Sequence, residues 1–336
     1  MTVFDDISLP LVAAPMAGGA TTPALVTAAA RAGALGFLAA GYRTPEDLAA
    51  QIAAVRGVPF GVNVFAPNPV PVDRAAFRRY AASLAPEAEA LGLDLTGAEP
   101  VEDDDHWAAK VDLLLADPVP VVSFTFGLPP AGLVASLRRA GTAVVQTVTS
   151  LAEARAAAGL GVDALVVQSF AAGAHSGTLT PGAAIPEVPL PDLVSGIRAG
   201  VSLPIVAAGG LGTAADVARV LAAGASAAMV GTVLLRSPES GASAPHRAAL
   251  ADPARTGTVL TRAFTGRPAR GLRNGFIERH DAEAPSGYPA VHHLTAPLRR
   301  AAAAAGDADR LHLWAGTGYR HATADPVATI LARLAP

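Results

Sequence analysis

Short apolar runs alternate with alanine-rich segments along this chain of 336 residues. The runs are Leu11–Ala14, Leu35–Ala39, Pro59–Val64, Val119–Phe124, Ala143–Thr147, Ala164–Gln168, Pro204–Ala208 and Ala227–Val230. Their length and composition predict buried strands, and strands that alternate with helices pair in parallel. Eight such units favour a closed TIM-type (β/α)8 barrel over an open doubly wound sheet, which more often has five to seven strands.

The alanine-rich segments have helical periodicity and end at glycines. Examples are Thr213–Ala223 before Gly224, Ser150–Ala158 before Gly159, and Leu133–Ala140 before Gly141. Two stretches are too long for this repeat. We expect residues 67–118 to be an extended excursion within the barrel, and residues 235–323 to form a C-terminal, mainly helical substrate cap inserted after strand 8. The barrel then comprises residues 1–234 and 324–336, with Pro326–Leu334 as its last helix.

The composition excludes several classes of function. The formal net charge is −3, without a basic cluster that would indicate nucleic-acid binding. There is no cysteine, which excludes thiolate metal sites and cysteine nucleophiles, so redox chemistry needs a bound cofactor. The start MTVFDDISLP lacks a signal-peptide pattern, and charged residues and glycines interrupt the apolar stretch Leu203–Leu235. We expect a cytoplasmic protein without a membrane segment, and a homodimer is compatible with the alanine-rich surface.

The candidate site residues follow the predicted strands at their carboxyl ends, where barrel enzymes keep their active sites. As cofactor contacts we select Pro15, Met16, Ala17, Asn63, Gln146, Gln168, Gly173 and Ala174. From the residues alone, Met16 fits a core filler equally well, and Asn63 fits a satisfied buried amide.

His175 is the candidate catalytic residue. It stands between small residues in VVQSFAAGAHSGT, where backbone and ligand approach closely, and imidazole exchanges a proton near neutrality. A lone histidine in such a loop is also compatible with a purely structural role.

Glycines after the last two strands predict a phosphate site. AAGGLG carries Gly209 and Gly210 directly before a helix, and MVGT carries Gly231 and Thr232. Exposed backbone N–H groups and a helix dipole bind phosphate at this place in barrels. With no cluster of metal ligands in the sequence, flavin mononucleotide (FMN) is the best single interpretation.

Several blocks resemble nitronate monooxygenases, formerly called 2-nitropropane dioxygenases, and most resemble their first class. The blocks are APMAGGATTPALVTAAARAGALGFLAAGY, FGVNVF, VVSFTFG, the His175 loop, PIVAAGGLGTAADVARVLAAGASAAMVGT, TVLTRAFTGRPARGLRN and LWAGTG, and the resemblance runs from about Leu9 to Gly318. It implies an FMN-dependent oxidation of alkyl nitronates, and sometimes nitroalkanes, by O2 to carbonyl compounds and nitrite through a flavin semiquinone. His175 matches the family's active-site histidine, either as base or as a partner for an anion.

The His175 loop departs from the family pattern, which commonly reads close to GSEAGGHRG. Phe170 replaces an acidic residue, Ala174 a glycine and Ser176 an arginine. We therefore assign Phe170 and Ser176 to the substrate pocket, and Phe170 motivates the hypothesis of a bulkier or less polar substrate.

The cap adds further candidates. Trp314 is assigned to the substrate pocket, because the corresponding family block returns toward the flavin. His292 and His293 diverge on a helix or strand and do not suit one metal, so surface or capping roles are favoured. Arg267, Arg270 and Arg273 fit either an anion site or exposed charges. The run Glu102–Asp105 favours a solvated helix start over a metal site.

Two other readings stay open. One is an FMN-dependent enoyl-thioester reductase that uses NAD(P)H, against which the tail blocks argue. The other is a diverged or non-catalytic flavin barrel, in which the altered loop reports a different substrate or lost activity.

Overall fold

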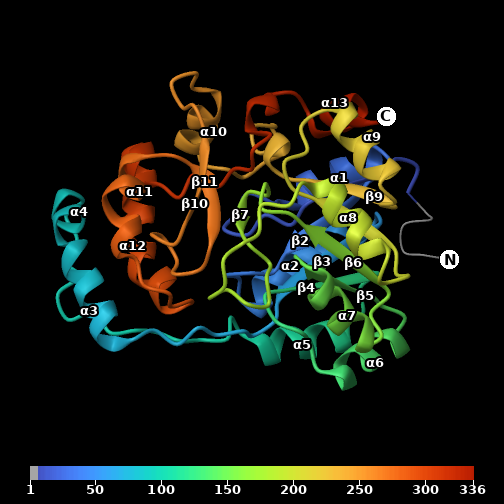
Figure 1. Ribbon diagram of the computed structural model, residues 1–336, viewed down its shortest axis with the longest axis horizontal. Helices are drawn as coiled ribbons and strands as arrows, with labels where there is room; N and C mark the ends of the chain where they lie inside the picture. Colours follow the sequence, from blue (N-terminus) through green and yellow to red (C-terminus); the bar gives the residue numbers. More distant parts are fainter. Residues whose placement is uncertain (1–6) are drawn as a thin grey trace.

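The computed structural model describes residues 7–336, and its eight main strands close a parallel barrel in the order β1-β2-β3-β4-β5-β6-β8-β9 (Figure 1). The strands are β1 (Leu11–Ala13), β2 (Leu35–Ala39), β3 (Phe60–Phe65), β4 (Val121–Thr125), β5 (Ala143–Val148), β6 (Ala164–Gln168), β8 (Ile205–Ala208) and β9 (Ala227–Val230). Each coincides with a predicted run, so the predicted TIM-type barrel is confirmed. In β1, Val12 pairs with Met229 of β9 on one side and with Leu35 of β2 on the other.

Helices between the strands cover the outside of the barrel. They are α1 (Pro23–Arg31), α2 (Pro45–Val55), α5 (Trp107–Ala116), α6 (Ala131–Arg139), α7 (Leu151–Gly159), α8 (Leu190–Arg198), α9 (Ala214–Ala222) and α13 (Val327–Leu334). Thr213 caps α9 with a reciprocal capping box to Asp216. The glycine predicted to close α7 was misplaced, because Gly159 is still helical and Gly161, at φ +80°, makes the turn.

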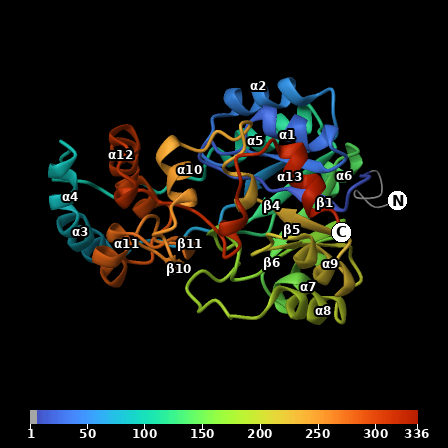
Figure 2. The same ribbon diagram turned by 90° about the horizontal axis from the view of Figure 1, so that it is seen from above.

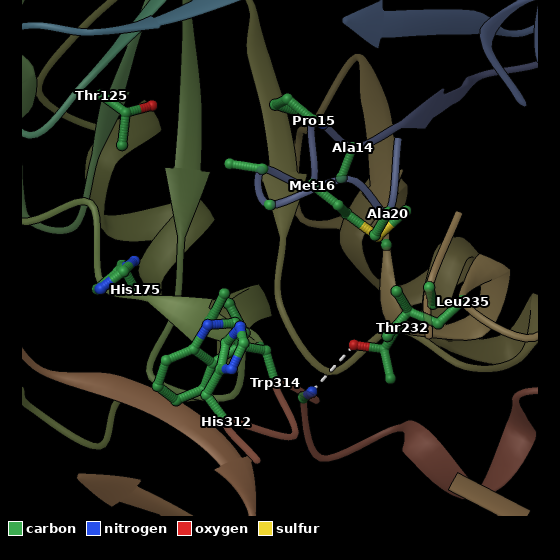
Figure 3. Close-up of a pocket in the computed structure, with 18 of the residues that line it drawn as sticks. Ala14, Pro15, Met16, Ala20, Thr125, His175, Thr232, Leu235, His312 and Trp314 are labelled. Carbon is green, nitrogen blue, oxygen red and sulfur yellow. Dashed lines mark hydrogen bonds between the residues drawn. The ribbon is translucent and has the colours of Figure 1, made fainter. Parts of the chain in front are cut away.

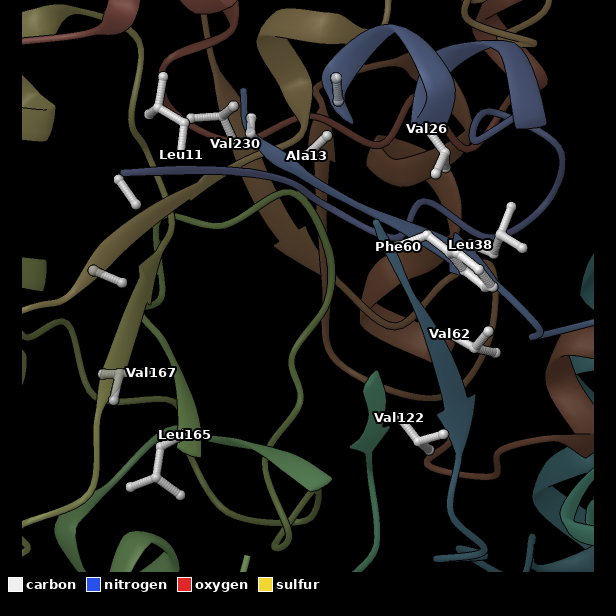
Figure 4. Close-up of a cluster of buried hydrophobic side chains, with 14 of the residues drawn as sticks. Leu11, Ala13, Val26, Leu38, Phe60, Val62, Val122, Leu165, Val167 and Val230 are labelled. Carbon is white, nitrogen blue, oxygen red and sulfur yellow. The ribbon is translucent and has the colours of Figure 1, made fainter. Parts of the chain in front are cut away.

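Alternation along the strands separates two apolar layers. Val12 packs inside the barrel with Phe37 and Val145. Its neighbours Leu11 and Ala13 belong to the cluster between the strands and the surrounding helices (Figure 4). Because side chains alternate across a strand, a residue's position in its strand decides whether it faces the barrel axis or the helices. No helix in the stretch 7–336 is long and apolar enough to span a membrane.

The cap lies beside one mouth of the barrel (Figure 2). It contains α10 (Ala244–Ala251), α11 (Gly275–His280) and α12 (Ala290–Ala305), with the short 3-10 turns η2 (Asp281–Glu283), η3 (Ala308–Arg310) and η4 (Tyr319–His321). The 3-10 turn η1 (Thr232–Leu234) follows β9 and leads into the cap. A small antiparallel sheet, which the sequence did not predict, joins the cap to the barrel. Its order is β10 (Thr258–Thr261), β11 (Ala269–Leu272) and β7 (Ala174–His175), so the strand that carries His175 is a cap strand as well.

The 67–118 segment contributes helices to both the cap and the barrel. Its helices α3 (Arg74–Ser83) and α4 (Ala85–Ala90) pack with α11 and α12 in one apolar cluster, in which Phe77 and Tyr80 meet Phe264 and Phe276. Its last helix, α5, places Leu114 in the barrel cluster. The excursion therefore supplies part of the cap, and Figure 1 shows α3 and α4 beside α11 and α12.

Candidate active site

A cavity of about 510 Å³ opens at the carboxyl ends of the barrel strands, beneath the cap (Figure 3). Its volume lies in the range of ligand sites. Met16 follows β1 in its wall, Asn63 comes from β3, Thr147 from β5, Gln168 from β6 and Met229 from β9. The cap supplies the opposite wall. Strand order in the barrel thus brings residues distant in the sequence to one site.

Most predicted site residues line this cavity. They are Pro15, Met16, Ala17, Asn63, Gln168, Gly173, Ala174, His175, Gly209, Gly210, Gly231, Thr232 and Trp314. Gln146 is a correction. It is fully buried on β5, but its neighbour Thr147 faces the cavity, and alternation turns Gln146 to the other side of the strand. There its Nε2 donates to the carbonyls of Gly127 (3.2 Å) and Thr147 (3.0 Å).

Phe170 and Ser176 are also corrections, because neither lines the cavity. The Phe170 ring lies beside the Arg270 guanidinium, 5.7 Å from ring centroid to guanidinium carbon. Ser176 is buried, and its carbonyl accepts a hydrogen bond from Arg267 Nε (3.3 Å). The hypothesis of a bulkier substrate loses its basis, since Phe170 packs on the sheet rather than beside the ligand space.

His175 is held by its backbone and by its ring. Its residue pairs with Ala269 in the small sheet, and its carbonyl accepts from Gln168 Nε2 (3.2 Å). Ring atom Nε2 lies 2.9 Å from Thr265 Oγ1. Burial lowers the pKa of His175 to about 3, and the charges of Arg267 and Arg299 act in the same direction. The imidazole is therefore neutral at neutral pH.

The glycine turns supply unpaired backbone donors. Gly209 and Gly210 have φ of +124° and +74°, a region that favours glycine. Among the residues that the structure describes, the N–H groups of Gly209, Gly210 and Gly231 donate to no protein acceptor. All three glycines line the cavity, and Thr232 Oγ1 accepts from the Gly316 N–H (2.9 Å), which ties β9 to the tail (Figure 3). This arrangement suits a phosphate group.

Comparison with known proteins assigns the chain to a family. The nitronate monooxygenase family profile covers residues 2–336. The chain belongs to the nitronate monooxygenase family. It is therefore an oxidoreductase, as the sequence resemblance predicted. A probable nitronate monooxygenase of Staphylococcus aureus (strain Newman) is 36% identical over 99% of this chain and 95% of the relative.

Two solved structures are similar to this chain over nearly its whole length. A nitroalkane oxidase from Streptomyces ansochromogenes is 47% identical, with a TM-score of 0.92 over 99% of this chain and 96% of that one. FabK from Thermotoga maritima is 26% identical, with a TM-score of 0.75 over 98% of this chain and 93% of that one.

In this family member, the sequence did not indicate several residues of the barrel wall or most of the cap wall. The cavity is also lined by Tyr42, Phe65, Thr125, Phe126, His246, Thr265, His292, Arg299, Arg300 and His312. Helical periodicity in the sequence could have indicated part of this wall, because one face of α12 lines it with His292, Ala296, Arg299 and Ala303. The surface role favoured for His292 is wrong. Its ring stacks on Tyr42 at 4.2 Å, whereas His293 turns away and meets Asp103 at 2.9 Å.

The three cap arginines do not form one anion site. Arg267 is fully buried and Arg270 nearly so, whereas Arg273 is exposed. Arg270 Nε donates to the Phe170 carbonyl (2.7 Å) and thereby joins the cap sheet to the loop after β6. Arg267 and Arg270 therefore bond backbone carbonyls. Of the three, only Arg273 is an exposed charge, which was the alternative to an anion site.

The acidic run before α5 binds protein groups. Asp105 lies 2.7 Å from the buried Lys110 amine and accepts from the Tyr42 N–H (2.9 Å). Asp104 Oδ1 accepts from the N–H of Trp107, the first residue of the helix (3.4 Å). Between Ile7 and Pro336 no three His, Asp or Glu side chains are grouped as metal ligands.

Proposed function

We propose that the protein is an FMN-dependent enzyme that oxidises alkyl nitronates, and nitroalkanes after deprotonation, with O2 to a carbonyl compound and nitrite. The observation that carries this is a neutral His175 imidazole in the wall of the same cavity as an unpaired glycine N–H cradle. The Streptomyces relative named as a nitroalkane oxidase has 47% identity to this chain, which supports the same substrate class.

The residues present fit FMN. The N–H groups of Gly209, Gly210 and Gly231 would hold its phosphate, and the segment Pro15–Ala17 with Asn63 and Gln168 would contact its ring system. Bound FMN supplies the electron acceptor and the centre at which O2 is used. Small residues at the strand ends leave the space that a flat ring needs.

The charges around the cavity favour an anion. Arg299 and Arg300 line it, and no Asp or Glu is found among its described lining residues. The four histidines of the wall are neutral, because burial lowers the pKa of each. A nitronate carries a full negative charge, and a nitro group gains one when its α-carbon loses a proton. Cationic groups in a site of low dielectric stabilise such charge strongly.

His175 suits the proton step. Burial keeps the ring unprotonated, so it has a lone pair for the α-proton of a neutral nitroalkane, and the anion formed beside it has to raise the basicity of the ring for the transfer. The negative charge formed on the nitro group then stabilises the imidazolium beside it. An already ionised nitronate does not need this step.

The test begins with the visible spectrum of the purified protein. We expect a bound flavin whose spectrum changes on anaerobic mixing with an alkyl nitronate, and nitrite formation once O2 is admitted. Reduction by NAD(P)H with no response to nitronates would instead favour the enoyl-thioester reductase. A flavin that responds to neither would indicate a different substrate or a non-catalytic barrel.

A further inference from the structure

The His175 ring has one side-chain hydrogen-bond partner in the described part of the chain, the hydroxyl of Thr265. Thr265 is 1% exposed and lies in the cap turn between β10 and β11. It also lines the cavity. A barrel loop thus carries the candidate base, and a cap residue holds it at 2.9 Å.

The other contacts of the Thr265 hydroxyl decide which atom donates in its hydrogen bond with His175 Nε2. Thr265 Oγ1 lies 3.2 Å from the Arg267 carbonyl and accepts from the Arg267 N–H at 3.4 Å. Within residues 7–336 the Arg267 carbonyl has no other donor, and Arg267 is fully buried. A buried carbonyl left without a donor is unfavourable, so the single hydroxyl proton goes to this carbonyl. Nε2 of His175 must then carry the proton that it shares with Oγ1.

We propose that Thr265 is a positioning residue that holds His175 as the Nε2–H tautomer, so that Nδ1 is the atom that accepts the substrate's α-proton. The identity of that substrate rests on the proposed function, whereas the tautomer does not. Nδ1 makes no hydrogen bond to a described residue, and the ring lines the cavity, so this atom is available to a ligand. The bond made by one ring nitrogen fixes the role of the other.

The turn that carries Thr265 is fixed on both sides. Arg267 donates from Nε to the Ser176 carbonyl (3.3 Å) and from Nη2 to the Thr178 carbonyl (2.5 Å). Its guanidinium lies 4.0 Å over the Phe126 ring. On the barrel side, Glu153 accepts from Thr178 Oγ1 (2.7 Å). The loop after His175 is therefore pinned between cap and barrel, and the distance from Thr265 to the ring is set by rigid groups.

No carboxylate takes the place of this hydroxyl. The titratable or charged groups near His175 are Arg267 from the turn before β11, Tyr288 just before α12, His292 and Arg299 from α12, and His312 before Trp314. None of them is a carboxylic acid. A histidine base is usually oriented by an acceptor on its second nitrogen, and here the neutral threonine oxygen is the acceptor in contact.

Thr265→Val removes the hydroxyl at nearly constant volume, and Thr265→Ser keeps it. We expect T265V to lower kcat/KM for a neutral nitroalkane by about tenfold or more, the loss of one aligned hydrogen bond in the proton-transfer step. Turnover of the preformed nitronate should fall much less than that of the nitroalkane, because it needs no proton abstraction, and T265S should restore nitroalkane turnover. Thr261→Val, which removes another buried cap hydroxyl bonded to Asp281 (2.6 Å), is the matched control.

Equal losses on both substrates, or the same split in T261V, would reduce Thr265 to a structural role and overturn the proposal. A second readout is independent of activity. In ¹⁵N-histidine NMR, His175, assigned by its absence in H175N, should show a protonated Nε2 and an unprotonated Nδ1 at neutral pH. A wild-type Nδ1–H tautomer also overturns the proposal. If neither nitro compound is oxidised, the proposed function fails while the NMR result still decides the tautomer, even where T265V does not fold.

Discussion

Ala174 adopts a backbone conformation that residues with a side chain rarely take. Its φ is +62°, and it stands directly before His175. The left-handed region costs an alanine about 1–2 kcal/mol relative to its preferred conformations. The residue persists there because β11 pairs with it through Arg270, and the strand fixes the chain direction into His175.

We therefore predict that Ala174→Gly raises the free energy of unfolding by about 0.5–1 kcal/mol, the relief of strain less the extra freedom of glycine in the unfolded chain. Urea unfolding measures this. Ala172→Gly is the control, because Ala172 is not among the positive-φ residues and gains no relief, so that variant should be destabilised. A174G that is no more stable than wild type would show that the strain is absent in solution.

At the scale of elements, one carboxylate joins helix α4 of the 67–118 segment to α11 and η3 of the cap. Glu87 of α4 is 5% exposed. Its Oε1 accepts from Arg279 Nε (2.6 Å) and His280 Nε2 (3.0 Å) at the end of α11, and its Oε2 accepts from Arg310 Nε (2.6 Å) in η3. These hydrogen bonds outweigh the effect of burial and lower the pKa of Glu87 to about 2.

Glu87→Gln should lower the free energy of unfolding by about 2–3 kcal/mol, since charge-assisted bonds are lost and the cationic partners remain. Because the folded pKa is below the ordinary value of 4.5, the carboxylate's contribution is complete above pH 4.5 and is lost as the pH falls toward about 2. Urea midpoints at pH 7 and pH 3 measure both effects. Glu99→Gln, which breaks exposed pairs with Arg74 and Arg78, should change little. Equal effects of the two variants would contradict the role given to Glu87.

The elements of the barrel were predictable from the sequence, whereas some elements of the cap were not. Buried parallel strands are continuous apolar runs, and each of the eight is visible in the sequence. β7, only two residues long, and β11, with the sequence ARGL, lack such a signal. The docking of α3 depends on distant partners, as in the bond from Tyr80 Oη to the Ala263 carbonyl (2.5 Å). Local patterns carry no information on such pairs.

The candidate site shows the same limit. The glycine turns and His175 follow strands and line the cavity, whereas Gln146 was misassigned because a one-position shift changes the face of a strand. His292 and Arg299 reach the cavity through the placement of the whole of α12, which depends on Phe264, Phe276 and the other residues of the cap cluster. Sequence patterns therefore identify the barrel half of the site better than the cap half.

For the whole molecule, the cavity lies between barrel and cap, so a ligand there should stabilise both. A ligand that binds only the folded state adds RT ln(1 + [L]/Kd), about 2.7 kcal/mol at a hundred times Kd. We expect FMN to raise the melting temperature of the flavin-free protein, and riboflavin, which lacks the phosphate, to do so far less at equal concentration. The reason is the set of unpaired N–H groups at Gly209, Gly210 and Gly231. Hydrogen exchange should slow with FMN in α12 as well as at the glycine turns, because both walls lose freedom together. Equal stabilisation by the two flavins would show that the glycine turns do not bind the phosphate.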